Sequence, residues 1–337
     1  MRAIAKKIAY RANALNAYHS LLHRNCLTVL MFHRVLPDSE MMRMGADPAY
    51  TITPALLAGV LEFVNRHYSL VSANEVLASL RRESPLPPRP LLVTFDDGWR
   101  DNVEWGLPVL RGHPWTMFVA AEVDAEPGLW WQEVLLWTVR TGRATYEDLW
   151  ERAPSRNSQT AATDPTDILA LLLRFGNLPP DDRRATLAPY EAELRPRCNG
   201  RQMVGKEELI ALRKERVDLG AHGASHLPLS RLPDPADDLE RSWDWRQTVG
   251  GLPILSLPHG RYDANVIRTA RNLGYAAIFT SDPALNACPD GWLKNAVIGR
   301  ISMPAASVCG ESGVLSAERL SAHLYLRPRE HHKSEFL

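Results

Sequence analysis

Short apolar runs that end in polar residues recur along the chain, and helix-like segments separate several of them. The runs are rich in leucine, β-branched and aromatic residues and cover residues 90–95, 217–221, 254–257 and 275–280. Runs of this length bounded by turn residues are typical of buried strands in a parallel sheet. A helical segment over 264–273, opened by Asp263 and ended by Gly274, precedes the last run. This alternation predicts an α/β fold, a parallel β/α barrel.

The alternation of strand-like and helix-like segments is interrupted between residues 128 and 205. Helix-like pieces over 132–140, 168–175 and 183–195 alternate there with polar, proline-containing stretches such as 153–165. We interpret residues 128–205 as a mainly helical insertion over the mouth of the barrel, without a core of its own. Because loops at the C-terminal rim of a barrel select substrates, we expect the insertion to govern substrate choice and not the chemistry.

Both ends of the chain differ in character from the middle. Residues 1–25 place isoleucine, leucine and tyrosine at helical spacing among arginine and lysine, which predicts a basic amphipathic helix. Its apolar stripe can lie on an anionic membrane surface or pack against the barrel, and the sequence leaves both open. Residues 26–330 are assigned to the barrel with its insertion, and residues 331–337 to a polar tail.

The sequence predicts no membrane span, because it has no run of about 18 apolar residues. The apolar run 27–32 is too short to be the core of a signal peptide, and His33 and Arg34 interrupt it. Four cysteines show no paired spacing, which argues against a zinc knuckle or a disulfide framework and favours a reducing compartment. We therefore expect a cytoplasmic protein, with residues 1–24 available for peripheral contact with the inner face of the membrane.

Composition fits an ordinary globular enzyme. The chain has 337 residues, of which 45% are hydrophobic and 23% charged, enough for one barrel-sized core with insertions. The formal net charge is zero and no basic patch with interleaved aromatics occurs, so nucleic acid is not an expected partner. Most of the ten tryptophans are expected in the core. Trp130 and Trp131, at the edge of the insertion, are the best candidates for contact with a ligand.

Two predicted strands end in residues that suit metal chemistry. Asp96 and Asp97 follow one strand, although Asp-Asp-Gly is also good turn chemistry. His222 and His226 follow another, and two imidazoles at this spacing can converge from a helix or a turn. Gly223 leaves no glutamate between them, so the base of the zinc-protease motif is missing. Since parallel strands end at the same edge of a sheet, one aspartate can bind a cation while the other takes a proton.

A third run closes in Pro258-His259-Gly260, a turn that can aim backbone N–H groups into a site as an oxyanion hole does. Taken in order, three motifs resemble those of the polysaccharide deacetylase family, the NodB-homology domain: Thr94–Gly98, His222–His226 and Leu255–Gly260. The strand over 30–35 and the segment 274–280 are also similar to family members. The resemblance covers about residues 27–302 apart from the insertion. It implies a β/α barrel that is irregular or incomplete.

The resemblance also implies roles for these residues. Asp96 becomes the general base, and Asp97, His222 and His226 become the ligands of a divalent metal ion. Three ligands of mixed nitrogen and oxygen type with an open fourth position suit a catalytic Zn²⁺ best. Such an ion lowers the pKa of bound water towards about 7 and polarises an amide carbonyl. The implied activity is a metal-dependent hydrolase that removes N-acetyl groups from sugars of a glycan or glycan precursor.

The sequence departs from the family at the groups that orient the base and protonate the leaving amine. Residues 255–257 lack the arginine that orients the base in many members, and Arg300 is either its replacement or an ordinary strand-end arginine. His259 replaces the usual tyrosine and can line the oxyanion site or act as the acid. His323 has the spacing of the family's late acid motif, but its surroundings predict an amphipathic helix. The identity of the acid therefore stays open.

Several alternative functions also stay open. The same machinery can act on an O-acetyl ester or on a non-sugar amide. The fold can also serve as a catalytically silent glycan-binding domain. A phosphotransferase with Asp96 as its nucleophile is less favoured, because no Asp-x-Asp spacing or phosphate loop accompanies it.

Overall fold

The computed structural model describes residues 14–125, 129–153, 166–310 and 313–328. Its strands are β1 (Cys26–Phe32), β2 (Arg34–Val35), β3 (Thr51–Ile52), β4 (Ser69–Leu70), β5 (Pro90–Phe95), β6 (Trp115–Val119), β7 (Val217–Ala221), β8 (Ile254–Ser256), β9 (Ala277–Phe279), β10 (Asn286–Ala287), β11 (Val297–Ile298) and β12 (Ile301–Ser302). Its α-helices are α2 (Ala14–Leu22), α3 (Asp38–Met44), α4 (Pro54–His67), α5 (Ala73–Leu80), α6 (Leu107–Leu110), α7 (Trp131–Arg140), α8 (Tyr146–Arg152), α9 (Ile168–Gly176), α10 (Pro180–Leu194), α11 (Lys206–Leu212), α12 (Ala236–Thr248), α13 (Ala264–Leu273), α14 (Ala305–Val308) and α15 (Ala317–Tyr325).

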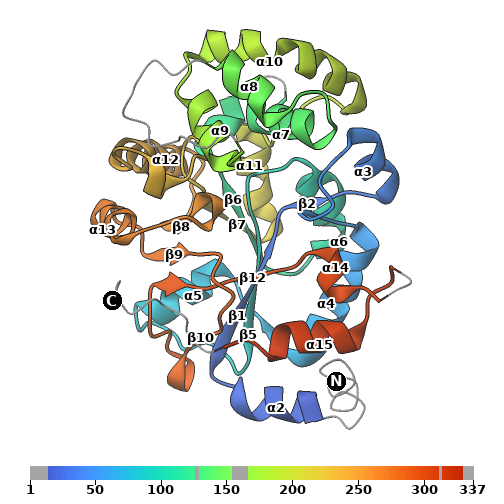
Figure 1. Ribbon diagram of the computed structural model, residues 1–337. Helices are drawn as coiled ribbons and strands as arrows, with labels where there is room; N and C mark the ends of the chain where they lie inside the picture. Colours follow the sequence, from blue (N-terminus) through green and yellow to red (C-terminus); the bar gives the residue numbers. More distant parts are fainter. Residues whose placement is uncertain (1–13, 126–128, 154–165, 311–312, 329–337) are drawn as a thin grey trace.

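Parallel pairing builds a barrel-like sheet whose strands follow the order β10-β1-β5-β6-β7-β8-β9-β11. All of these pairs are parallel except β1 with β10. β11 pairs with β9, while β12 pairs with β1 on the other side of the barrel. Gly299 and Arg300 join these two short strands and therefore lie at the seam where the barrel nearly closes (Figure 1). The predicted irregular parallel β/α barrel is confirmed.

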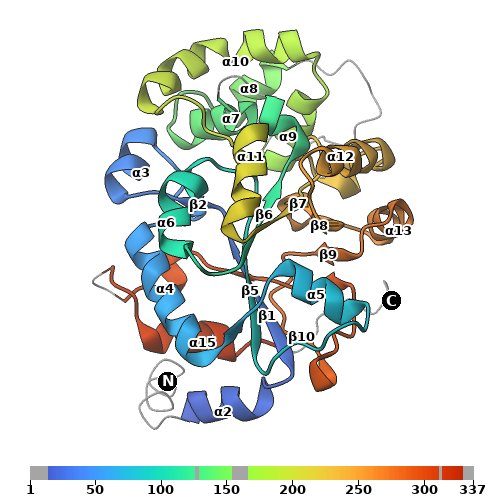
Figure 2. The ribbon, with the colours of Figure 1, turned by 180° about the vertical axis from the view of Figure 1, so that it is seen from behind.

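The central strands are buried along their whole length, which explains why they appear as continuous apolar runs in the sequence. Every residue of β1, β5 and β6 is buried. The helices α4, α5, α11, α12, α13 and α15 surround the sheet (Figures 1 and 2). Phe95, Trp115 and Phe118 are among the largest fully buried side chains. A core of this kind fixes the strand ends, from which the polar residues of the site project.

Several predicted elements lie where the sequence placed them. The helix over 264–273 is α13, and the Asp263 side chain accepts a hydrogen bond from the Val266 N–H at its start. Gly274 ends it with a φ of +107°, a conformation that glycine adopts without the steric cost of a Cβ. The run 275–280 forms a shorter strand than expected, β9. The run 30–35 is divided between β1 and β2 at His33.

The segment between the first and second motifs contains the helices α7, α8, α9 and α10. These helices gather at the end of the molecule towards which the strands β1 and β5 run (Figure 1). Trp137 of α7 and Phe175 of α9 belong to the same buried cluster as Phe95 and Trp115 of the barrel. The helices are therefore continuous with the barrel core and cover the edge where the strands end.

The N-terminal helix α2 lies at the opposite end of the barrel, beside α15 (Figure 1). Leu15 and His19 are buried against the barrel, whereas Leu21 is 79% exposed and Leu22 46%. One face of α2 thus packs and another faces solvent. Residues 1–13 and 331–337, which carry the rest of the predicted basic helix and the polar tail, lie outside the described residues. Among the described helices, none has both the length and the apolar character to cross a bilayer.

Candidate metal centre and active site

The first part of the site follows β5. The N–H of Asp96 donates to the carbonyl of Phe32 at 2.9 Å and so continues the pairing of β5 with β1. Asp97 then has a φ of +76° and Gly98 a φ of +89°. A Cβ on Gly98 would lie 2.8 Å from a methyl carbon of Val119, so only glycine fits this turn. The left-handed turn sends the two adjacent carboxylates in different directions, and strain of this kind is typical of functional sites.

The second part of the site follows β7. Residues 222–226 form a loop rather than a helix, so the two imidazoles converge from a turn. Asp238 of α12 holds this loop: its carboxylate accepts hydrogen bonds from the backbone N–H of Ala224 at 2.7 Å and of Ser225 at 3.0 Å. Asp238 is only 3% exposed, so these bonds are shielded from water.

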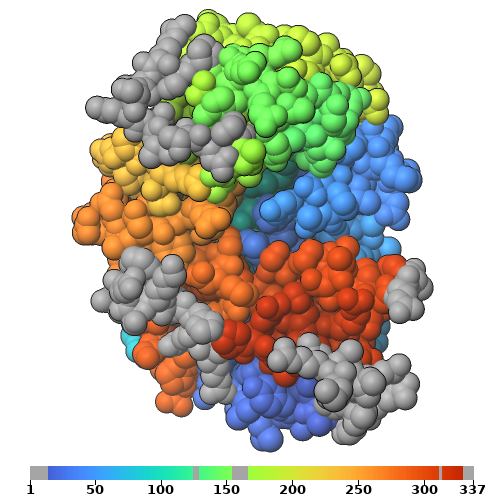
Figure 3. All heavy atoms as spheres, viewed as in Figure 1, coloured from blue at the N-terminus to red at the C-terminus, as the bar shows by residue number. Residues whose placement is uncertain are grey.

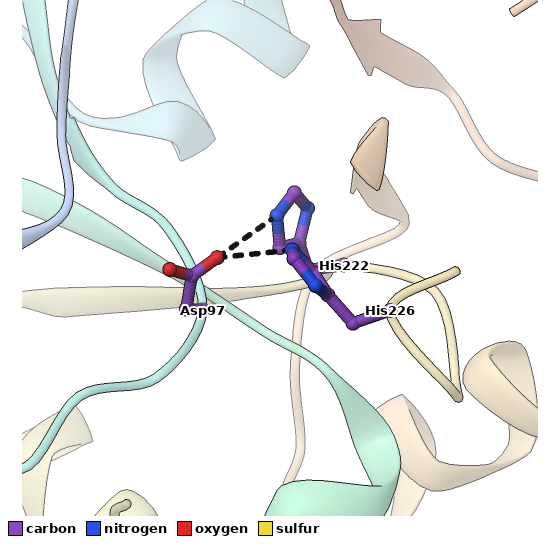
Figure 4. Close-up of side chains that lie close together, drawn as sticks. All are labelled: Asp97, His222 and His226. Carbon is purple, nitrogen blue, oxygen red and sulfur yellow. Dashed lines mark ion pairs between the residues drawn. The ribbon is translucent and has the colours of Figure 1, made fainter. Parts of the chain in front are cut away.

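Asp97, His222 and His226 meet at one point (Figure 4). Asp97 Oδ1 lies 3.3 Å from His222 Nε2 and 3.1 Å from His226 Nε2. All three residues are buried, and their ligand atoms lie within 4.8 Å of one another. The other carboxylate oxygen, Asp97 Oδ2, accepts a 2.8 Å hydrogen bond from Trp99 Nε1, which leaves Oδ1 facing the two imidazoles.

The donor and acceptor pattern of this group suits a cation. His222 Nδ1 lies 2.9 Å from the carbonyl of Ser256, which can only accept, so this nitrogen carries the proton and Nε2 presents a lone pair. Asp97 Oδ1, also an acceptor, has no hydrogen-bond partner among the described residues although it is buried. Buried acceptors that converge without a donor are costly unless a cation lies between them. The three residues can therefore hold a metal ion.

The pKa values of Asp97, His222 and His226 each depend on burial and on the charges of the neighbouring residues. Burial alone would raise the pKa of Asp97, but the imidazoles of His222 and His226 outweigh it and hold that pKa well below its usual range. Burial tends to lower the pKa of His222, yet the carboxylates of Asp96 and Asp97 raise it. Burial dominates for His226, whose pKa is lowered. Without a metal, a proton on His222 can partly replace the missing positive charge.

Asp96 has a different environment from Asp97. Arg300 reaches it from the barrel seam and donates from Nη1 to Oδ1 and from Nη2 to Oδ2, both at 2.7 Å. Ser256 of β8 donates to Asp96 Oδ2 at 3.1 Å and accepts from Arg300 at 2.8 Å. Burial would raise the pKa of Asp96, but Arg300 more than offsets it and lowers that pKa. Asp96 is thus a buried, ionised carboxylate beside the metal-ligand group.

Two histidines that the sequence offered as acids occupy different places. His259 lies in the turn Pro258–Gly260 with a φ of +56°, and its ring centroid is 4.5 Å from that of His226. Burial lowers its pKa to about 3, so it carries no proton to donate near neutral pH. His323 lies on α15, where its Nε2 is 2.9 Å from the carbonyl of Ser302 and Arg327 contacts its ring.

The two tryptophans at the edge of the insertion are mostly buried. Trp130 is 4% exposed, and its ring packs edge-on against His226 with 5.0 Å between centroids. Trp131 is 8% exposed and lies under the guanidinium of Arg183. Trp130 therefore borders the metal-ligand group, whereas Trp131 belongs to the packing of the insertion. Contact with a substrate stays a prediction for both.

His33 is a site residue that the sequence analysis passed over. It follows β1, and because Phe32 pairs with Phe95 it stands beside Asp96 at the same sheet edge. Its imidazole contributes to lowering the pKa of both Asp96 and Asp97. The half-buried ring packs edge-on against Tyr50, with 4.9 Å between centroids. The strand expected over 30–35 placed His33 in its interior, and only the end of β1 at Phe32 shows that His33 stands at the sheet edge.

A surface pocket opens beside His33. It is lined by residues of the first strand, of the segment 49–52 and of the segment after the seam: Met31, Phe32, His33, Arg34, Ala49, Tyr50, Thr51, Ile52, Ser302, Met303 and Pro304. In Figure 3 the surface is hollowed between the green insertion and the red C-terminal segment, with dark blue residues from the early part of the chain at the bottom. His33 thus lies between this pocket and Asp96.

No family model matches the sequence, and no curated protein matches it either. Solved structures do match. The deacetylase PplD of Streptococcus pyogenes, in complex with acetate, shares 14% identity with a TM-score of 0.55, covering 89% of this chain and 98% of that one. IcaB from Ammonifex degensii shares 18% identity at the same TM-score, covering 89% and 97%. A de-N-acetylase from Aggregatibacter actinomycetemcomitans shares 16% identity with a TM-score of 0.53, covering 82% and 94%. At these identities the likeness shows a shared fold.

Proposed function

We propose that this protein, which has the fold of the polysaccharide deacetylases, is a metal-dependent hydrolase that removes N-acetyl groups from sugars of a glycan or glycan precursor. One observation carries the proposal. The Asp97, His222 and His226 group, which can hold a metal, lies beside a second carboxylate, Asp96, that an arginine keeps ionised. A ligand group next to a separate base is what metal-assisted amide hydrolysis requires.

The roles of the residues follow from their environments. Asp97, His222 and His226 would hold a divalent ion, most plausibly Zn²⁺ from its preference for mixed nitrogen and oxygen ligands, and that ion would polarise the acetyl carbonyl and acidify a water molecule. Asp96 takes the proton of the attacking water, because Arg300 and Ser256 hold its carboxylate in place and ionised. A backbone N–H of the turn at His259 donates a hydrogen bond to the oxyanion that forms from the acetyl carbonyl.

The amine must leave with a proton, and we propose His33 as its donor. His33 stands beside Asp96 at the sheet edge and also lines the surface pocket. It is half-buried, so a substrate in the pocket can contact it. His259 is a poor acid since its pKa is about 3, and His323 is bound to the Ser302 carbonyl. The ring of Tyr50, 56% exposed above His33, offers a flat face on which a sugar can stack.

We further propose that α2 makes peripheral contact with a membrane. Tyr18, Leu21 and Leu22 are exposed on α2, next in sequence to basic residues 2, 6, 7 and 11. An exposed apolar face combined with positive charge is the composition of an interfacial helix. Sedimentation with anionic vesicles, compared between the full chain and a chain lacking residues 1–24, tests this contact.

Acetate release tests the hydrolase. The purified protein, loaded with Zn²⁺, Co²⁺ or Ni²⁺ in turn, is incubated with N-acetylglucosamine oligomers and with an O-acetylated glycan. We expect release from the N-acetylated substrate, loss of metal and turnover in His226→Ala, and loss of turnover with metal retained in Asp96→Asn. Turnover of the O-acetylated glycan alone would identify an esterase. Bound metal with no release from either substrate would contradict the hydrolase and favour a glycan-binding domain.

A further inference from the structure

We infer that Gln132, in the helical insertion, is a positioning residue that fixes the ring of the metal ligand His226. The inference rests on the proposed metal site and extends it to a segment outside the three sequence motifs. Gln132 is the second residue of α7 and is 1% exposed. Its side chain crosses from the insertion to the loop after β7, 94 residues further along the chain.

The hydrogen bonds of Gln132 determine which way its amide is turned. Nε2 donates to the carbonyl of Ser225 at 2.9 Å and to the carbonyl of His226 at 3.3 Å. Both partners can only accept, so the NH₂ group must face them. The amide oxygen Oε1 must then face the other way, where it lies 2.9 Å from His226 Nδ1. A flipped amide would oppose oxygen to oxygen in a buried site.

This orientation sets the tautomer of His226. Since Oε1 can only accept, Nδ1 of His226 carries the proton and Nε2 presents its lone pair towards Asp97 Oδ1, 3.1 Å away. His222 reaches the same tautomer through the backbone carbonyl of Ser256. The barrel therefore orients one imidazole with its backbone, whereas the insertion orients the other with a side chain. Outer partners of this kind fix ring direction and raise ligand basicity.

The helix that carries Gln132 is anchored to the barrel side of the molecule. Arg140, at the other end of α7, donates to the carbonyl of Gly45 and pairs with Glu133 at 2.8 Å. Glu133 in turn lies 3.6 Å from the buried guanidinium of Arg34, which follows β1. These contacts fix the position of α7 relative to the edge of the sheet. On this inference the insertion also supports a metal ligand, in addition to the role in substrate choice that its position predicts.

The experiment measures metal affinity in the metal-free full chain rather than turnover. Zn²⁺ and Co²⁺ are titrated into wild type, Gln132→Met and the control Gln247→Ala, whose glutamine is exposed on α12. Methionine keeps the volume of Gln132 but cannot accept from Nδ1. We expect a loss of about 10–100-fold in affinity for Gln132→Met and no change for the control. Long-range ¹H–¹⁵N spectra of the metal-free proteins should show the Nδ1–H tautomer of His226 in wild type and a tautomer mixture in Gln132→Met.

A double variant separates positioning from general damage. The background is His226→Ala, titrated to the much higher metal concentrations that its two remaining ligands, Asp97 and His222, require. There Gln132→Met should cause no further loss of the residual affinity, because the ring that it orients is gone. An additional loss of the same size there would show that Gln132 acts through the fold, and would overturn the inference. Equal affinity of wild type and Gln132→Met would overturn it too. If wild type itself bound neither metal, the proposed function would fail first, at an earlier step of the same titration.

Discussion

Replacing Arg300 tests the link between the barrel seam and the base. Arg300→Met keeps the length of the side chain but removes both 2.7 Å bonds to Asp96. Asp96 is 2% exposed, and its remaining side-chain donor is Ser256 at 3.1 Å among the described residues. Breaking a buried pair by removing one partner costs about 3–5 kcal/mol, because the other charge stays buried without compensation.

That cost falls on the ionised form of Asp96, so the pKa must rise. Protonation of Asp96 removes the unpaired charge, so part of the lost stability returns when the carboxyl is neutral. Arg300 is the largest of the influences that lower the pKa of Asp96 against burial, which gives the direction. A protonated Asp96 cannot accept a proton from water. The acid limb of the pH dependence of kcat/KM should therefore move to higher pH.

The assay is acetate release from an N-acetylated oligosaccharide as a function of pH, with metal in excess, alongside denaturation at neutral pH. Arg184→Met serves as the control, since Arg184 is 69% exposed on α10 and its ion pair with Asp181 should be worth about 1 kcal/mol or less. Arg300→Met/Asp96→Asn should regain part of the stability lost in Arg300→Met, without activity, because the unpaired charge is gone. An unchanged acid limb in Arg300→Met would refute the reasoning.

Two further predictions concern histidines. His33→Ala should lower kcat far more than it changes KM while metal content by elemental analysis stays at the wild-type level; a loss of metal instead would make His33 part of the metal site. Burial lowers the pKa of His19 from 6.5 to about 4 in the ring stack with Tyr325, so the folded chain binds fewer protons than the unfolded chain between these values, and stability falls as pH falls. Relative to His19→Phe, wild type should lose about 2 kcal/mol of unfolding free energy between neutral pH and about pH 5, as measured by urea denaturation. If the unfolding free energies of the two proteins changed equally with pH over this range, the assignment would be wrong.

The parts of the site that could be predicted from sequence are those set by local pattern. Asp96 and Asp97 directly follow a strand, as do His222 and His226. An apolar run that ends in polar residues encodes both the strand and the position of the side chains after it. The helix α13 was predictable for a similar reason, since Asp263 and Gly274 mark its two ends within one short segment.

The supporting residues could not be predicted in this way, because they meet the site only through tertiary packing. The sequence leaves Arg300 as either the arginine that orients the base or an ordinary strand-end arginine, because its contact with Asp96 spans 204 residues and depends on packing. Gln132 appears in the sequence as one polar position of an amphipathic helix. Ser256 appears in the sequence as one position of a short strand-like run, and its contact with Arg300 depends on the seam. Partners of this kind are specified by which strands and helices pack together, and not by spacing along the chain.

The origin of the supporting residues suggests how the site depends on the fold. Asp96 is kept ionised by Arg300 from the seam, where β11 and β12 pair with opposite sides of the barrel. His226 is oriented by Gln132 from the insertion, at the edge where the strands end. Asp96 therefore gains its partner Arg300 only when the barrel has closed, and His226 gains its partner Gln132 only when the insertion has packed against the barrel. A metal ion that binds the folded chain but not the unfolded chain stabilises the folded state by mass action. Because its binding needs both the closed seam and the docked insertion, the ion would stabilise both parts against unfolding. The proposed metal centre thus depends on the whole fold and not on its three motifs alone.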